Sequence, residues 1–156
     1  FLSGFKGAYN YTDVNRVESA VEYLAQRLVE TPEEIKEIAK NKGVYWNQDF
    51  FGVNYNPENY EEITAKNDWK INDIFSEEER KKYLRKILYI LASLGSIPSG
   101  FPKTLNGLTH SGANIIEKSI VDFYESLNSL KNEKEKLIIG TAKSWYYSGD
   151  LYGGEV

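Results

Sequence analysis

The sequence predicts an all-α fold, a small bundle of three long amphipathic helices with shorter helices and an irregular aromatic segment beside them. Two observations lead to this prediction. Apolar residues recur every three or four positions in three separate stretches, as they do on one face of a helix. Residues that cap helices precede each stretch. Helices of this kind bury their apolar faces against each other, so a single bundle is expected.

The first helix is expected over residues 12–29. Thr12 is a natural N-cap, and Asp13 lies in the first turn, where the helix dipole favours a carboxylate. One face carries the apolar residues Val14, Val17, Val21, Leu24 and Leu28. These features predict a helix start at Thr12, rather than a reaction centre, for the polar cluster at residues 9–16.

A separate second helix is expected to follow at once. Thr31 would cap it, Pro32 would occupy its first position, and Glu34 would complete a capping box with Thr31. Ile35 lies in its short apolar stripe, and Gly43 is expected to end it.

Residues 44–74 show a weaker pattern and are expected to be irregular. A short helix is predicted from Pro57 to about Ala65, and an extended conformation is considered for residues 68–74. Aromatic residues gather here and again near the end of the chain: Trp46, Phe50, Phe51, Tyr55, Tyr60, Trp145, Tyr146, Tyr147 and Tyr152. Such residues either stack on sugar or protein partners or fill a thin core under loops, and we favour the core interpretation.

The next helix, over residues 77–94, has the clearest signals. Ser76 caps it, Glu79 completes the capping box, and Gly95 is the expected stop. Its predicted apolar face consists of Tyr83, Leu84, Ile87, Leu88, Leu91 and Leu94, with Ile90 widening it.

The last long helix is expected over residues 110–130, with Thr109 as its cap. Its predicted face consists of Ala113, Ile116, Ile120, Phe123, Leu127 and Leu130. Residues 131–136 are polar, the apolar pattern resumes at Leu137, and residues 145–156 are interpreted as a glycine- and tyrosine-rich tail.

Composition restricts the possible functions. The 156 residues suit a single domain, and the net charge of −4 without an isolated basic block argues against nucleic-acid binding. No apolar run approaches the roughly 20 residues that span a bilayer. The chain has no cysteine, which excludes disulfides, thiolate metal sites and a cysteine nucleophile. It has no methionine, not even at position 1, so a piece of a longer polypeptide is expected, with removal of a tag as the alternative.

The sequence offers no convincing catalytic, cofactor or metal site, and we predict that the protein is not an enzyme. Any hydrolase triad would need the single histidine, His110, and its neighbour Ser111 cannot face it on a helix. The 23 acidic residues allow arbitrary carboxylate pairs, and no calcium-loop or phosphate-loop spacing is present. A possible interaction surface comprises Trp46, Phe51, Tyr55, Tyr146, Tyr147 and Tyr152.

Four spaced motifs resemble a poorly characterised helical domain of phage and prophage tail proteins from Gram-positive bacteria. The first is Tyr-Asn-x-Thr-Asp-hydrophobic-Asn-Arg-Val-Glu, here residues 9–18. The second is Trp-x-x-x-Asp-Ile, here residues 69–74, and the third is Leu-Thr-x-x-x-Ala-Asn-x-Ile-Glu-Lys, here residues 108–118. The fourth is Tyr-Ser-Gly-Glu-Leu-Tyr-Ser-Gly-Glu, from which Asp150 and Gly153 depart.

The resemblance implies a virion role in the baseplate, tail tip or fibre, and it brings no catalytic residues. It implies other tail proteins as partners, a symmetric homo-oligomer, and a location in the tail, outside the cell after assembly. The alternative is a module that recognises cell-wall glycan or a surface protein through its aromatic segment. Among the motif residues, we expect Arg16 and Glu117 to pair between helices.

Overall fold

The computed structural model describes residues 10–46 and 57–151, with side chains up to residue 144 in the last helix. Its elements are α1 (Tyr11–Asn41), the 3-10 helix η3 (Pro57–Tyr60), α2 (Glu77–Ala92) and α3 (His110–Leu151). No strand occurs in these residues. The fold is therefore all-α, as predicted.

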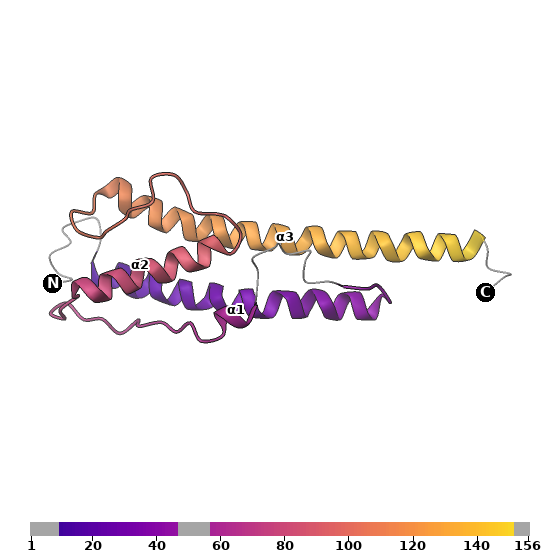
Figure 1. Ribbon diagram of the computed structural model, residues 1–156, viewed down its shortest axis with the longest axis horizontal. Coiled ribbons are helices and arrows are strands. Elements are labelled where there is room, and N and C mark those ends of the chain that lie inside the picture. Colours follow the sequence, from indigo (N-terminus) through magenta and orange to yellow (C-terminus); the bar gives the residue numbers. More distant parts are fainter. Residues whose placement is uncertain (1–9, 47–56, 152–156) are drawn as a thin grey trace.

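The three α-helices run in the same direction, from one end of the bundle toward the other (Figure 1). Two ion pairs show that α1 and α3 are parallel. Arg16 pairs with Glu117 near the starts of both helices, and Glu34 pairs with Lys131 further along both. Parallel neighbours cannot be joined by tight turns. The long connections at residues 42–76 and 93–109 return the chain to the starting end each time.

The cap of α1 is Asn10, so the prediction of Thr12 was wrong. The Asn10 side chain accepts hydrogen bonds from the backbone N–H groups of Thr12 at 2.9 Å and Asp13 at 3.3 Å. The Asp13 carboxylate accepts the Asn10 backbone N–H at 2.9 Å, which closes a capping box. Thr12 donates its hydroxyl to the same Asn10 oxygen, so it supports the cap from inside the first turn.

The prediction of a helix break at Thr31 was also wrong, because α1 continues through Pro32 for 31 residues in all. Proline removes one helical hydrogen bond and usually bends or ends a helix. Here the apolar face continues past it, with Ile35 0% and Ala39 1% exposed. Thr31 is buried inside the helix instead of capping a new one. Burial of this face outweighs the local preference, and the helix ends before Gly43, whose φ is +69°.

Helix α2 begins as predicted. The Ser76 hydroxyl accepts a hydrogen bond from the Glu79 backbone N–H at 3.2 Å, as an N-cap does. The helix ends at Ala92, before Gly95 at a φ of +65°. Its apolar face is rotated slightly from the predicted one, because Ile90 is 1% exposed while Leu88 is only half-buried.

Helix α3 is 42 residues long, about twice the predicted length. Its start is as predicted, since the Thr109 hydroxyl accepts the Gly112 backbone N–H at 3.0 Å. The polar stretch 131–136 does not end it, because Lys131 pairs with Glu34 at 2.8 Å and with Glu135 at 3.5 Å. The helix also covers residues 145–151, which were interpreted as a tail.

The core lies between the three helices and is closed at the starting end by residues 61–76. Trp69 packs on Phe75 with 5.0 Å between ring centroids, and Phe75 meets Tyr83 of α2 edge-on at 5.9 Å. The predicted helix from Pro57 to Ala65 shortens to the four residues of η3, and residues 68–74 form turns and loops. The fully buried helical side chains include Leu24, Leu28, Ile35, Ile87, Leu91, Ile116, Phe123 and Leu127.

Candidate functional site

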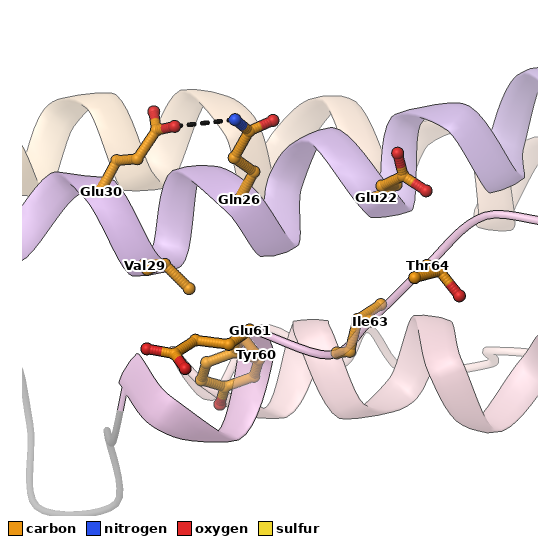
Figure 2. Close-up of a pocket in the computed structure, with 8 residues that line it drawn as sticks. All are labelled: Glu22, Gln26, Val29, Glu30, Tyr60, Glu61, Ile63 and Thr64. Carbon is orange, nitrogen blue, oxygen red and sulfur yellow. Dashed lines mark hydrogen bonds between the residues drawn. The ribbon is translucent and has the colours of Figure 1, made fainter.

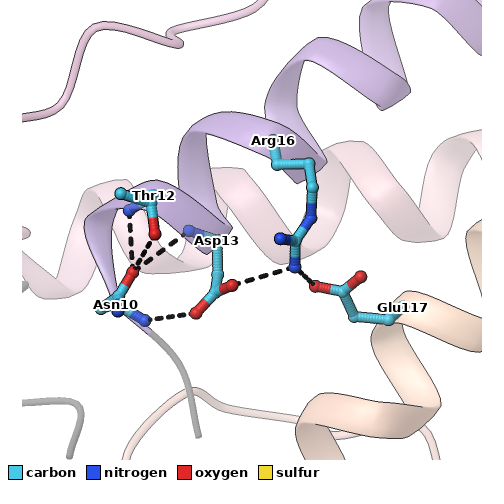
Figure 3. A network of polar contacts seen from close by, with 5 residues as sticks. All are labelled: Asn10, Thr12, Asp13, Arg16 and Glu117. Atoms are coloured by element: carbon cyan, nitrogen blue, oxygen red, sulfur yellow. Dashed lines mark hydrogen bonds and ion pairs between the residues drawn. The ribbon is translucent and has the colours of Figure 1, made fainter. Parts of the chain in front are cut away.

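Residues of the first three motifs meet at the starting end of the bundle, whereas residues 147–151 of the fourth motif form the end of α3 at the other end. Figure 3 shows the first part of this network, in which the Asn10–Asp13 capping box continues into a chain of charges. Arg16 donates to Asp13 at 2.9 Å and also to Glu117 of α3. The expected pairing of Arg16 with Glu117 is therefore confirmed. The hydrogen bond from Arg16 to Glu117 raises the pKa of the guanidinium above its usual value.

A second part of the network fastens the loop at residues 64–70 to α1. The Asn15 side chain donates to the Trp69 carbonyl and accepts the Trp69 backbone N–H, both at 2.9 Å. The buried carboxylate of Glu18 accepts the Lys66 backbone N–H at 3.1 Å and the Lys86 ammonium group at 2.7 Å. One face of α1 thereby holds the loop. The ion pair of Lys86 with Glu18 connects α2 to the same part of α1.

These contacts give structural roles to the motif residues that make them. Each residue drawn in Figure 3 has at least one polar partner among the other four. His110 is exposed in the first turn of α3. Within the part of the chain that the structure describes, no three His, Cys, Asp or Glu side chains gather closely enough to hold a metal ion.

A groove of about 410 Å³ lies between α1 and the segment that follows η3 (Figure 2). Val29 points from α1 toward this segment, where Tyr60 and Ile63 supply further apolar surface. Its complete lining is Glu22, Gln26, Val29, Glu30, Tyr60, Glu61, Ile63 and Thr64. The lining carries carboxylates but no basic side chain. The carboxylates are partly engaged, since Glu22 accepts the Ala65 backbone N–H and Gln26 donates to Glu30 at 2.8 Å.

The predicted interaction surface is only partly within the described residues. Trp46 is half-buried and packs against the hydrophobic core, as the core interpretation expects. Tyr146 and Tyr147 lie on the backbone of α3, and their side chains are outside the described set. Phe51, Tyr55 and Tyr152 lie outside the described residues, as does Phe50. The interaction surface made of these six residues therefore stays a prediction.

A charged cluster that the sequence did not predict joins the far half of α1 to α3. Arg27 forms two hydrogen bonds with the Glu34 carboxylate, at 2.7 and 2.9 Å, and Glu34 also meets Lys131 at 2.8 Å. The hydrogen bonds from Arg27 and Lys131 lower the pKa of Glu34 to about 2. The seven-residue spacing of Arg27 and Glu34 equals two helical turns, but it signals a contact only if the helix continues through Pro32.

No family model matches the chain, and neither a curated protein nor a solved structure matches it. None of the helices in the described residues is long and apolar enough to cross a membrane.

Proposed function

We propose that the protein is a non-enzymatic structural module that docks parts of a phage or phage-like tail to each other, in the baseplate, tail tip or fibre. The assignment to a phage tail protein is supported by the four sequence motifs that resemble the phage tail domain. In this proposal the amphipathic helices serve internal packing, and residues 57–74 of the irregular segment fill space beside them. The partners are other virion proteins and further copies of the chain in a symmetric assembly.

One observation carries the docking role. Helix α3 extends well beyond the end of α1, so none of the other described helices lies beside its final turns (Figure 1). Before these turns, level with the end of α1, Leu137 and Ile139 of α3 are 51% and 39% exposed, on either side of the buried Ile138. Apolar side chains exposed on a helix favour helix-to-helix association, because burial against a partner removes their surface from water.

Self-association tests the docking role directly. Sedimentation velocity of the chain at about 100 μM is expected to show an oligomer, and replacement of Leu137 and Ile139 by Glu is expected to give a monomer. Ile71 and Ile74 provide the matched control, because they are 52% and 68% exposed but lie in the loop at the other end of the bundle. Their replacement by Glu should leave the oligomer intact. A monomeric parent chain, or an equal effect of both double variants, would contradict docking through α3.

The tail location requires a separate experiment. Antibodies against the purified protein should label one end of the tail of induced phage particles in electron micrographs, and the neighbouring genes should encode other tail proteins. Label restricted to the bacterial cytoplasm would reject the location without affecting the self-association result.

The alternative function, recognition of cell-wall glycan or a surface protein, receives less support. It requires free aromatic side chains in the segment after α1, and Trp46 is packed against the core. Binding of the chain to purified host cell walls, lost when Phe51 and Tyr55 are changed to Ser without a change in the melting temperature, would favour this alternative over docking.

A further inference from the structure

Arg80 in the second turn of α2 has a buried group without a protein partner. Its Nε is buried and has no hydrogen-bond acceptor among the residues that the structure describes. The other arginines differ: Arg16 and Arg27 are paired with carboxylates, and the Nε of Arg85 donates to the Lys81 carbonyl at 3.4 Å. A buried donor without an acceptor is costly, and partly buried arginines are normally paired.

Arg80 lines a small pocket between α2 and the return loop that leads to α3. The pocket has a volume of about 50 Å³ and is lined by Glu77, Arg80, Lys81, Leu84, Lys103, Thr104 and Leu105. This volume is less than the share of two liquid water molecules, so the pocket suits one small group and not a whole cofactor.

The lining carries an excess of positive charge. Arg80, Lys81 and Lys103 contribute three cations, and the single acid, Glu77, is already 3.6 Å from Lys81. The Thr104 hydroxyl oxygen accepts the Asn106 backbone N–H at 3.1 Å, which leaves its own hydrogen for another acceptor. The chain as a whole has a net charge of −4, so this cluster is a local feature.

We propose that this pocket binds a compact oxyanion, a carboxylate or phosphate group, with Arg80 and Lys103 as its main ligands. A guanidinium matches such groups with two parallel hydrogen bonds, and the ammonium group of Lys103 adds a point charge. The buried side chains of Leu84 and Leu105 form the apolar wall, where the local dielectric is lower and charge-assisted hydrogen bonds are stronger. This site is independent of the docking surface proposed on α3.

The test uses nuclear magnetic resonance of the arginine side chains in the complete chain. The Nε–H resonances of Arg80 and Arg85 are followed while sodium phosphate, and separately sodium acetate, replaces sodium chloride at constant ionic strength. A saturable shift confined to Arg80 is expected, and the ion that saturates at lower concentration identifies the preferred group. The Lys103→Gln variant should weaken binding about tenfold or more, as expected for loss of a charge-assisted contact.

Arg85→Gln is the matched control, because Arg85 is on the same helix but does not line the pocket. It should leave the Arg80 titration unchanged. Lys103 is exposed in a loop, so its variant keeps the test valid even if Arg80→Gln fails to fold. A linear, unsaturated drift of Arg80, equal shifts of Arg80 and Arg85, or an unchanged affinity in Lys103→Gln would each overturn the site.

Discussion

Replacement of Asn15 by Ala should destabilise the protein more than its position near a helix end suggests. The Asn15 side chain makes two hydrogen bonds with the backbone of Trp69, both at 2.9 Å, and these hold the loop on α1. The Trp69 side chain is only 6% exposed and packs on Phe75. Loss of the amide group therefore removes the hydrogen bonds that position a buried aromatic residue.

The magnitude follows from the two hydrogen bonds. Each contributes about 0.5–1.5 kcal/mol net, and a buried backbone group left without a partner costs about 1–3 kcal/mol. We therefore expect Asn15→Ala to lower the free energy of unfolding by about 2–3 kcal/mol. Asn15→Asp should cost less, because a carboxylate still accepts the Trp69 N–H although it cannot donate to the Trp69 carbonyl.

Urea denaturation followed by tryptophan fluorescence measures the loss, with Asn114→Ala as the control. Asn114 is exposed on α3, so its replacement should change the free energy of unfolding by no more than about 0.5 kcal/mol. Hydrogen exchange should also show faster exchange of the Trp69 amide in Asn15→Ala. A loss below about 0.5 kcal/mol, with unchanged exchange at Trp69, would refute the assigned role of Asn15.

Three further predictions concern the helices. Phe123→Ala should lower the free energy of unfolding by about 3–5 kcal/mol in urea, because Phe123 is fully buried, whereas an equal change of the exposed Tyr124 should cost much less. Pro32→Ala should raise the melting temperature, since the penalty of about 3 kcal/mol for an internal proline exceeds the packing energy that its buried ring contributes; a lower melting temperature would contradict this. Glu34 has a folded-state pKa of about 2, below its unfolded value, so its contribution to stability is present above about pH 5 and disappears as the pH falls toward 2. Acid titration of Glu34→Gln should therefore show a weaker fall in stability over this range than the parent chain does.

The sequence predicted those helix ends whose signals lie within one turn. Ser76, Thr109 and the glycines at positions 43 and 95 were assigned correctly, because capping depends on neighbours three or four residues away. The cap of α1 was misplaced by two residues because Asn10 and Thr12 are both good caps. Only the folded geometry shows that the Asn10 oxygen receives both backbone N–H groups.

The errors arose where tertiary contacts outweigh local preference. Nothing near Pro32 in the sequence shows that Glu34 will meet Lys131, almost one hundred residues later, and that this contact helps hold the far half of α1 against α3. The same contact uses Lys131, one of the polar residues that were interpreted as the end of α3. The pairing of Arg16 with Glu117 was predicted only because both residues belong to the motifs that resemble the phage tail domain. The unpaired Nε of Arg80 has no sequence signal, because half of its neighbours in the pocket, Lys103, Thr104 and Leu105, come from the loop after α2.

The common direction of the three helices gives the chain a mechanical polarity. Helix α1 begins at one end of the bundle and helix α3 ends at the opposite end (Figure 1). At about 1.5 Å per residue, the 42 residues of α3 alone span roughly 60 Å. Anything joined ahead of α1 and anything joined behind α3 would therefore be held apart by a rod of this length. A pulling force between them would run along the helix axes. The ion pairs of Arg16 with Glu117 and of Glu34 with Lys131 connect α1 to α3 across these axes, so both pairs would be loaded in shear at the same time.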